Sequence, residues 1–403
     1  MTTIPTFREK STFAASLMKV NIRQFTMIFA LLAIWVIFTV LTDFVFLTPR
    51  NISNLMLQTA TTAILAIGMV LVIVTGNIDL SVGSTLGFTG AVAAMLMIKF
   101  NMDIYSTILL TLLVGIVIGA WHGYWVAYRK VPAFIVTLAS MLIFRGSIIG
   151  LTGGQTQGLE MAPPKVAQAF AAVGQQYLPK ISAKLPFNDT SLYFSLACIV
   201  IFIIFALYKR NSRIKYGFKV LPLGLELLKL AALSILIAVF ASFMILYLGI
   251  PYAVLLVLIF ALLFNFLANN TSFGRHLYAI GGNAEAARFS GINIAKATFI
   301  LFVIMGALYS VAGIVYTARL NAATTSAGTN AELDAIAASV IGGTSLMGGE
   351  GSIMGALIGA LVMASLDNGM SLMNLDITFQ YVIKGLILLI AVGVDIATRQ
   401  KSA

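Results

Sequence analysis

The chain has 403 residues, of which 60% are hydrophobic and only 10% charged, and its mean hydropathy is +1.00. Soluble domains carry about 25% charged residues, so this composition excludes an ordinary soluble protein. Apolar runs of about 20 residues recur, as expected of membrane-spanning helices, whereas barrel strands alternate every second residue. The net charge of +11 does not indicate nucleic acid, because excess Lys and Arg in membrane proteins lie in cytoplasmic loops.

The sequence predicts an all-α, polytopic membrane protein with about 12 embedded segments. In chain order these segments are residues 25–46, 52–75, 80–98, 104–127, 132–151, 190–208, 220–249, 251–268, 296–318, 333–347, 352–373 and 378–397. The first 24 residues are basic and lack the cleavage pattern of a signal peptide, so the N-terminus is predicted to stay in the cytoplasm. An even number of crossings then returns the C-terminus to the cytoplasm.

The positive charges agree with this orientation. Of the 25 Lys and Arg residues, 16 lie in segments assigned to the cytoplasm, as the positive-inside rule requires. They are Arg8, Lys10, Lys19, Arg23, Arg129, Lys130, Lys209, Arg210, Arg213, Lys215, Lys219, Arg275, Arg288, Lys296, Arg399 and Lys401. The loops assigned to the outside hold Arg50, Lys99, Lys165, Lys180, Lys184 and Arg319.

Two of the segments are predicted to be broken or half-length helices, near residues 76–90 and 331–350. The first follows GNIDLSVGS with almost no connecting loop, and the second is short and rich in Gly, Ala and Ser. Interrupted helices are tolerated in a membrane only where protein buries them or where they line a cavity. Both regions contain Val-Ile followed by Gly-Ser-x-x-Gly at one constant offset, which is either chance in a Gly-rich chain or the mark of two related halves.

The longest polar stretch between spans, residues 152–189, is assigned to the outside. It begins TGGQTQG and contains four prolines. The sequence is compatible with a disordered or loosely packed loop and equally with a docking surface for an external partner. The segment 209–229 is instead a basic cytoplasmic connection, whose simplest role is to fix the topology near anionic lipid.

The residues needed for an enzyme in the membrane are missing. The sequence contains no H-E-x-x-H, no Cys-His cluster and no G-x-x-x-x-G-K-[ST] phosphate loop, so no catalytic residue, metal site or nucleotide site is predicted. Most carboxylates lie at segment ends, which argues against a transporter coupled to an ion or a proton. The exceptions are Asp79, Asp334 and Asp367, which either cap helices or line a polar path.

Uncharged polar residues gather near the two breaks, and such groups suit a neutral, polyhydroxylated solute. Individually, Ser and Thr in membrane helices mostly pack helices together or bond their own backbone. Taken as a set they predict a substrate pathway. The candidate pathway residues are Asn77, Asp79, Ser84, Asp334, Thr344 and Asn368.

The stretch 275–293, RHLYAIGGNAEAARFSGIN, is a polar island between long apolar runs. Each unpaired polar group in hydrocarbon costs several kcal/mol, so this stretch is predicted to be a loop at the membrane surface. The charge pattern assigns it to the cytoplasm. A short helix there has Glu285 at its start, where the helix dipole favours a negative charge, and Gly291 at a turn of positive φ.

Several motifs in this chain resemble those of the monosaccharide permeases of bacterial ABC importers, the ribose, arabinose, galactose and xylose type. Glu285-Ala286-Ala287-x-x-x-Gly291 is similar to the EAA loop of ABC permeases. Four further blocks in order, from about residue 50 to the C-terminus, strengthen the likeness: NIDLSVGS, KVPAFIVTLASML, AELDAIAASVIGGTSLMGG and DNGMSL. Ribose-type relatives have about ten spans, and the extra pair at about 190–249 is similar to the longer xylose-type permeases.

The resemblance implies a machine of several chains in the bacterial inner membrane. It implies an ATPase dimer inside, which carries ATP and Mg, a periplasmic sugar-binding protein outside, and a second permease copy beside this one. This chain itself would need no cofactor. The residues that the resemblance assigns to ATPase coupling are Gly282, Asn283, Glu285, Ala286, Ala287 and Gly291. The cargo it implies is a pentose, with another sugar or a branched-chain amino acid as alternatives, and a transporter working alone as the alternative outside this class.

The expected domain organisation is a single permease domain over residues 25–397 between two cytoplasmic tails, 1–24 and 398–403. Within that domain the predicted surface regions are a periplasmic loop at 152–189, a basic cytoplasmic loop at 209–219 and the coupling loop at 270–295.

Overall fold

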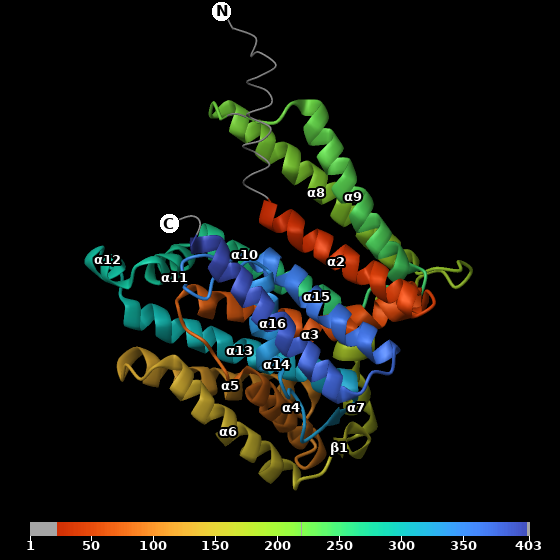
Figure 1. The fold of residues 1–403 in the computed structure, drawn as a ribbon. Helices are drawn as coiled ribbons and strands as arrows, with labels where there is room; N and C mark the ends of the chain where they lie inside the picture. The colour runs from red at the N-terminus through yellow and green to blue at the C-terminus, as the bar shows by residue number, and fades with distance from the viewer. Residues whose placement is uncertain (1–21, 219, 401–403) are drawn as a thin grey trace, which may run out of the picture.

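The computed structural model of the protein describes residues 22–218 and 220–400. Within them the chain forms a bundle of helices, and the strands are β1 (Gln157–Gly158) and β2 (Ala322–Ala323), which pair antiparallel (Figure 1). The prediction of an all-α membrane protein is therefore confirmed. Most of the predicted N-terminal tail, Lys219 and residues 401–403 lie outside the described residues.

Each predicted membrane segment corresponds to one helix. The first six are α2 (Ile22–Leu41), α3 (Pro49–Val74), α4 (Val82–Ile98), α5 (Ile104–Gly123), α6 (Ala133–Thr152) and α8 (Asp189–Lys215). The other six are α9 (Leu223–Ile245), α10 (Tyr252–Asn270), α13 (Ile294–Leu320), α14 (Ala331–Ile341), α15 (Ile353–Leu372) and α16 (Ile377–Gln400). Among the described helices, eight are long and apolar enough to cross a membrane, and shorter apolar stretches lie in α2, α4 and α16.

The short elements lie between these helices. They are η1 (Val45–Leu47), the π-helical turn η2 (Tyr124–Tyr128), η3 (Leu159–Met161), α7 (Pro164–Gln175), α11 (Ser272–Gly282) and α12 (Ala284–Phe289). The polar stretch 275–293 therefore contains most of α11 and all of α12, and α12 is the short helix that the sequence predicts at Glu285.

Helix α3 forms the centre of the bundle. Its start is specified locally, because the Thr48 side chain accepts a hydrogen bond from the Asn51 N–H and Pro49 occupies the first turn. Its second half, residues 63–74, is apolar on all sides, as expected of a helix surrounded by protein. Its neighbours α13 and α15 are also largely buried, so these three helices make the core around which the others pack.

The extra pair of helices, α8 and α9, forms a hairpin that extends away from the rest of the bundle (Figure 1). Its attachment includes Phe240 of α9, which stacks on Trp35 of α2 with ring centroids 5.5 Å apart. Most apolar side chains of α8 are exposed, as expected of a surface that faces lipid. The pair is a peripheral addition to the remaining ten helices, as the resemblance predicts.

The connections separate into two groups at opposite ends of the bundle. In Figure 1, α11, α12 and the C-terminus lie at the left, and β1 and α7 lie at the right. At the α7 end, the Leu178 N–H donates to the Ile250 carbonyl and the Leu159 N–H to the Asn321 carbonyl. At the α11–α12 end, the Gly349 N–H donates to the Val74 carbonyl. The loops that the sequence assigns to one side of a membrane thus contact one another.

The prediction that residues 152–189 could be disordered or loosely packed is wrong. The segment contains β1, η3 and α7, and the side chains of Leu159 and Phe170 are fully buried. Gln175 donates hydrogen bonds to the carbonyls of Ala318 and Arg319 at the end of α13. These apolar and backbone contacts hold the segment against the helix ends. Its Pro and Gly content does not predict this packing.

Candidate functional site

Helix α12 is a short helix in the polar stretch, and it projects from one end of the bundle (Figure 1). The Asn283 side chain accepts a hydrogen bond from the Ala286 N–H at 2.9 Å and so caps the helix. Glu285 lies in the first turn, and Gly291 just beyond the helix has φ of 83°. The local conformation that the sequence predicts for Glu285 and Gly291 is therefore present.

The exposed face of α12 mixes charge with one large apolar side chain. Glu285, Ala286 and Arg288 are exposed, and Phe289 is 81% exposed. Ala287 differs from the sequence-based expectation, because it is only 4% exposed and packs against its own protein. The Arg288 guanidinium lies over the Phe289 ring, 5.5 Å from its centroid, so the exposed surface of α12 is charged around a single aromatic side chain.

The preceding helix α11 is anchored to the bundle at several points. Leu277 and Ile280 are buried in the core, and the Tyr278 hydroxyl donates to the Gly351 carbonyl at 2.9 Å. Burial raises the pKa of the Tyr278 phenol, so the hydroxyl keeps its proton and remains a donor. Gly281 lies against the end of α3, where an added Cβ would be 1.6 Å from the Val74 carbonyl oxygen.

The two broken elements meet inside the bundle. Gly83 at the start of α4 touches Gly328, which precedes α14, and a Cβ added to either glycine would be 2.1 Å from the other's carbonyl oxygen. The Glu332 carboxylate, in the first turn of α14, lies against Gly83 as well. Helix α14 has 11 residues, so the prediction of a half-length helix there is confirmed. The N-terminal ends of α4 and α14 thus face one crossing point.

Asp79 fixes the turn at the first break, just before α4. The carboxylate is fully buried and accepts hydrogen bonds from the Ser81 N–H at 2.8 Å and the Ser81 hydroxyl at 2.7 Å. The Tyr309 hydroxyl of α13 donates to its other oxygen. These hydrogen bonds give Asp79 a structural role, which is one of the two roles that the sequence leaves open.

Most of the other candidate pathway residues are also engaged within the protein. Asn51 and Asn368 exchange two amide hydrogen bonds, of 2.8 and 3.1 Å, which join α3 to α15. The Ser84 hydroxyl donates to the Ser81 carbonyl. Thr344 is the exception, because it is fully buried and its hydroxyl has no hydrogen-bond partner among the described residues. Asn77 is partly exposed and reaches the surface of the first break.

Asp334 belongs to a cluster of three charged residues whose pairing the sequence does not predict. The Lys384 ammonium of α16 lies 3.1 Å from Asp334 of α14 and 2.9 Å from Asp367 of α15. Beside it a cavity of about 200 Å³ is also lined by Asn330 and Tyr381. The signal in the sequence was Lys384 itself, a cation inside an apolar run, which needs a partner.

We expect Lys384→Met to destabilise the protein. The change leaves two partly buried carboxylates without their cation, and breaking such a buried pair costs about 3–5 kcal/mol. Thermal unfolding in detergent measures the effect, with Lys384→Arg keeping the charge. Lys229→Met is the matched control, because Lys229 is exposed, its nitrogen lies 3.9 Å from the Glu226 carboxylate, and surface pairs contribute about 0–1 kcal/mol. Equal unfolding midpoints for Lys384→Met and Lys229→Met would contradict the expectation.

Arg145 is the second charged residue that the sequence analysis left unused. It lies in the middle of α6, and its guanidinium donates to the Ala327 carbonyl at 2.7 Å, next to Gly328. The Thr137 hydroxyl of the same helix accepts from the Leu80 N–H at 3.1 Å. Helix α6 therefore touches both broken elements, and its intramembrane arginine marks this region as a functional candidate.

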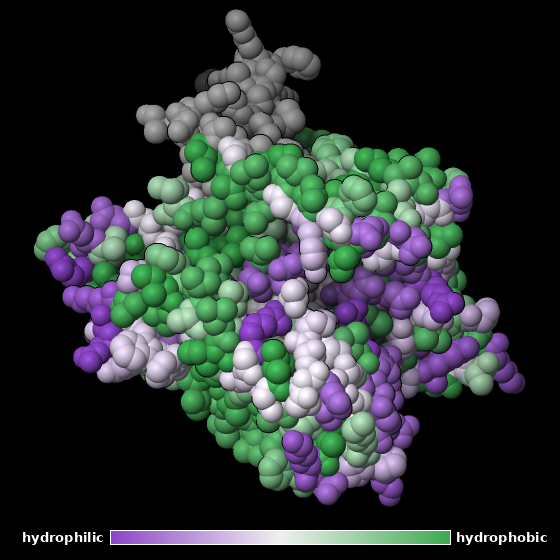
Figure 2. Space-filling view, turned by 60° about the horizontal axis from the view of Figure 1, so that its bottom comes forward, coloured by the Kyte–Doolittle hydropathy of each residue, from purple (hydrophilic) through white to green (hydrophobic). Residues whose placement is uncertain are grey.

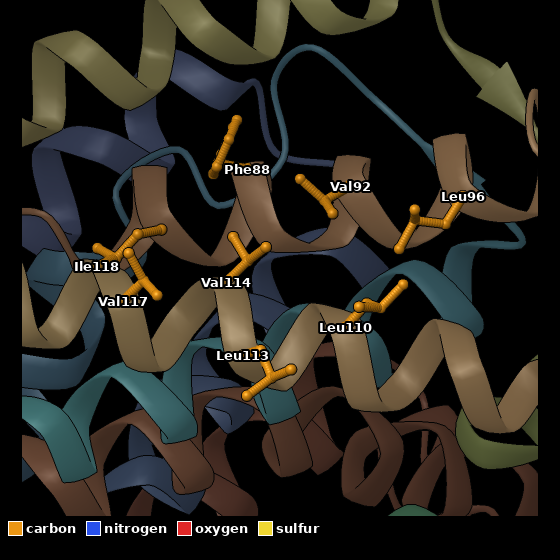
Figure 3. A pocket seen from close by; sticks show the side chains of 8 residues that line it. All are labelled: Phe88, Val92, Leu96, Leu110, Leu113, Val114, Val117 and Ile118. Atoms are coloured by element: carbon orange, nitrogen blue, oxygen red, sulfur yellow. The ribbon is translucent and has the colours of Figure 1, made fainter.

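The surface carries one polar band and one apolar hollow. Figure 2 shows hydrophilic and weakly polar residues extending from the right edge into the middle of one face, beside an apolar flank. A hollow of about 510 Å³ lies between α4 and α5 (Figure 3), and all eight side chains drawn there, including Phe88, Leu110 and Val117, are apolar. None of the eight side chains that line the hollow can form a hydrogen bond.

This architecture defines a class of protein. Two interrupted helices whose ends meet inside a helical bundle are the arrangement that transporters use to build a site near the middle of the membrane. The comparison of sequences gives the family. The model of the family described as "Branched-chain amino acid transport system / permease component" matches residues 51–392, and the chain belongs to this family.

Individual relatives are similar over nearly the full length. The chain is 44% identical to the xylose transport system permease protein XylH of Haemophilus influenzae over 385 residues, which cover 96% of this chain and 99% of the relative. It is 45% identical to XylH of Escherichia coli K12 over 389 residues, covering 96% and 95%. The ribose import permease protein RbsC of H. influenzae is 34% identical over 353 residues, covering 87% and 86%. No solved structure matches the chain.

Proposed function

We propose that this chain is the membrane permease subunit of an ABC importer that carries a pentose, D-xylose, into the bacterial cell. The observation that carries the proposal is the likeness to two xylose permeases over 96% of the chain. The exposed helix α12 supports it, because a separate driving protein needs a surface of this kind. The chain binds no cofactor in this scheme, and ATP and Mg belong to the ATPase.

The orientation follows from charge. The α11–α12 end carries the basic connections between the described helices and lies in the cytoplasm, in accordance with the positive-inside rule. The α7 end then faces the periplasm. Its folded segment 152–189 supplies a firm platform, and the sugar-binding protein docks there. Helix α12 enters a cleft of the ATPase, with Glu285, Ala286 and Phe289 in contact and Asn283 and Gly291 fixing its two ends.

The sugar passes along the polar surface around the two broken elements. Asn77 and Arg145 are partly exposed there, and Thr329 is exposed beside Gly328. Amide, hydroxyl and guanidinium groups suit the hydroxyls of a neutral pentose. A second copy of the permease closes the open side of this path, since the outer face of α6 carries exposed Leu138 and Leu142. ATP binding closes the ATPase dimer and turns the two permeases outward, and hydrolysis resets them.

Reconstitution tests the proposal. The permease, its ATPase and its binding protein are placed in proteoliposomes, and uptake of labelled xylose, ribose, galactose and leucine is measured with and without ATP. The expected result is ATP-dependent uptake that requires the binding protein and favours xylose. Preferred uptake of another sugar or of leucine would overturn the assigned cargo. Uptake by the permease alone, with no ATPase retained after mild detergent extraction, would overturn the importer.

A further inference from the structure

A tight backbone contact joins the coupling helices to both broken elements. We call it the junction and define it by Val74, Tyr278, Gly281, Gly349 and Gly351. The Val74 carbonyl lies against Gly281 and accepts the Gly349 N–H at 2.8 Å, and the Tyr278 hydroxyl donates to the Gly351 carbonyl at 2.9 Å. Three chain segments that are distant in sequence therefore meet backbone to backbone.

The junction lies at the α11–α12 end of the bundle, next to the segments that connect α3 to α4 and α14 to α15. Val74 is the last residue of α3, and the next residues, 75–81, lead directly into α4. Gly349 and Gly351 belong to the segment that links α14 to α15. The far ends of both routes, Gly83 and Gly328, touch each other at the crossing. The segment from Val74 to Gly83 and the segment from Gly328 to Gly351 are therefore in contact at both ends. We call the Gly83–Gly328 contact the crossing, and the two segments together the closed circuit between the junction and the crossing.

The backbones at the junction are too close for α11 to move independently of Val74 and Gly349. A Cβ on Gly281 would lie 1.6 Å from the Val74 oxygen and 2.6 Å from the Gly349 nitrogen, well inside van der Waals contact. Gly348 and Gly349 adopt φ of 84° and 76°, the left-handed conformation that lets the chain pass over α11 at this distance. Close-packed contacts of this kind transmit displacement rather than absorb it.

We propose that the junction transmits movement of the coupling helices to both broken elements at once, with Gly281 and Tyr278 as the positioning residues. The inference rests on the proposed function and adds the route by which the ATPase acts. A shift of α11 carries the end of α3 and the 342–351 segment with it. The starts of α4 and α14 then move relative to each other, and the path at Gly83 and Gly328 opens or closes.

The test measures coupling in the assembled importer. Gly281→Ala and Tyr278→Phe are compared with wild type for retained ATPase, basal ATP hydrolysis, stimulation of hydrolysis by xylose with the binding protein, and xylose uptake. In both variants we expect the ATPase to stay bound and basal hydrolysis to persist, while stimulation and uptake fall together. For Tyr278→Phe the loss should be about fivefold, the contribution of one partly buried hydrogen bond. The steric clash makes the Gly281→Ala loss larger.

Controls separate this result from a general loss of stability and from failure of the proposed function. Gly224→Ala on α9 has open space at its Cβ, and Tyr208→Phe on α8 is highly exposed, so both should behave as wild type. Normal stimulation and uptake in Gly281→Ala and Tyr278→Phe would overturn the junction. Loss of basal hydrolysis in parallel with a lower unfolding temperature would also overturn it. Absence of bound ATPase in the wild-type preparation would overturn the proposed function instead.

Discussion

We expect Glu285→Lys to abolish sugar uptake while the protein still inserts in the membrane. The change reverses the charge in the first turn of α12, on the exposed face that we propose enters the ATPase. Loss of a central interface residue costs about 2 kcal/mol or more, which is about thirtyfold in affinity. ATPase retained on the purified permease and uptake in proteoliposomes are the two measurements.

Glu226→Lys is the matched control. Glu226 also lies in the first turn of a helix, α9, so its reversal has a comparable effect on the helix dipole without touching the coupling surface. Its uptake should stay near wild type. If Glu285→Lys supports normal uptake with the ATPase bound, α12 is not the coupling element.

Gly291→Val tests the same surface through the backbone. Valine at φ of 83° is strained by about 1–3 kcal/mol, so we expect the turn after α12 to rearrange and to displace α12. Gly217, with φ of 74° and open space at its Cβ, provides a control in which the same strain occurs in the α8–α9 connection. We expect Gly291→Val to lose uptake and Gly217→Val to retain it.

Local signals explain which parts of the structure are predictable from the sequence. Helix α12 follows from a capping Asn283, an acidic first turn and Gly291, all within one short stretch. The half-length α14 follows from its Gly-rich end and short apolar run. The closeness of α15 to α14 follows from small residues at helical spacing, and a Cβ on Gly355 would lie 1.9 Å from the Gly342 oxygen.

Long-range partners explain what the sequence does not predict. Lys384 was visible as a charge in an apolar run, but its pairing with Asp334 and Asp367 depends on how three helices pack. Asn368 was a candidate for the pathway because it is one of the uncharged polar residues near the breaks. Its pairing with Asn51, 317 residues away in the chain, is visible only in the folded protein. The role of Val74 is also not predictable from the sequence. Its carbonyl contacts Gly281 and Gly349 only when α11 and the 342–351 segment are folded against it.

Gly83→Leu is expected to have the second large effect, at the crossing of the broken elements. The side chain would have to occupy the space of the Gly328 carbonyl oxygen, 2.1 Å from its Cβ, and of the Glu332 carboxylate, 2.2 Å away. Overpacking of a buried contact costs about 1–3 kcal/mol even where neighbours can move, and here one neighbour is backbone. The starts of α4 and α14 are therefore forced apart.

The crossing lies on the proposed sugar path, so the separation should hold the path in one state. We expect Gly83→Leu to keep the ATPase bound, because α12 is untouched, and to lose uptake completely. Gly224→Leu, which places the same side chain in open space on α9, should unfold at the wild-type temperature and transport normally. Normal uptake by Gly83→Leu would show that the two broken elements need not stay in contact for transport. The closed circuit between the crossing and the junction would then have no role in coupling.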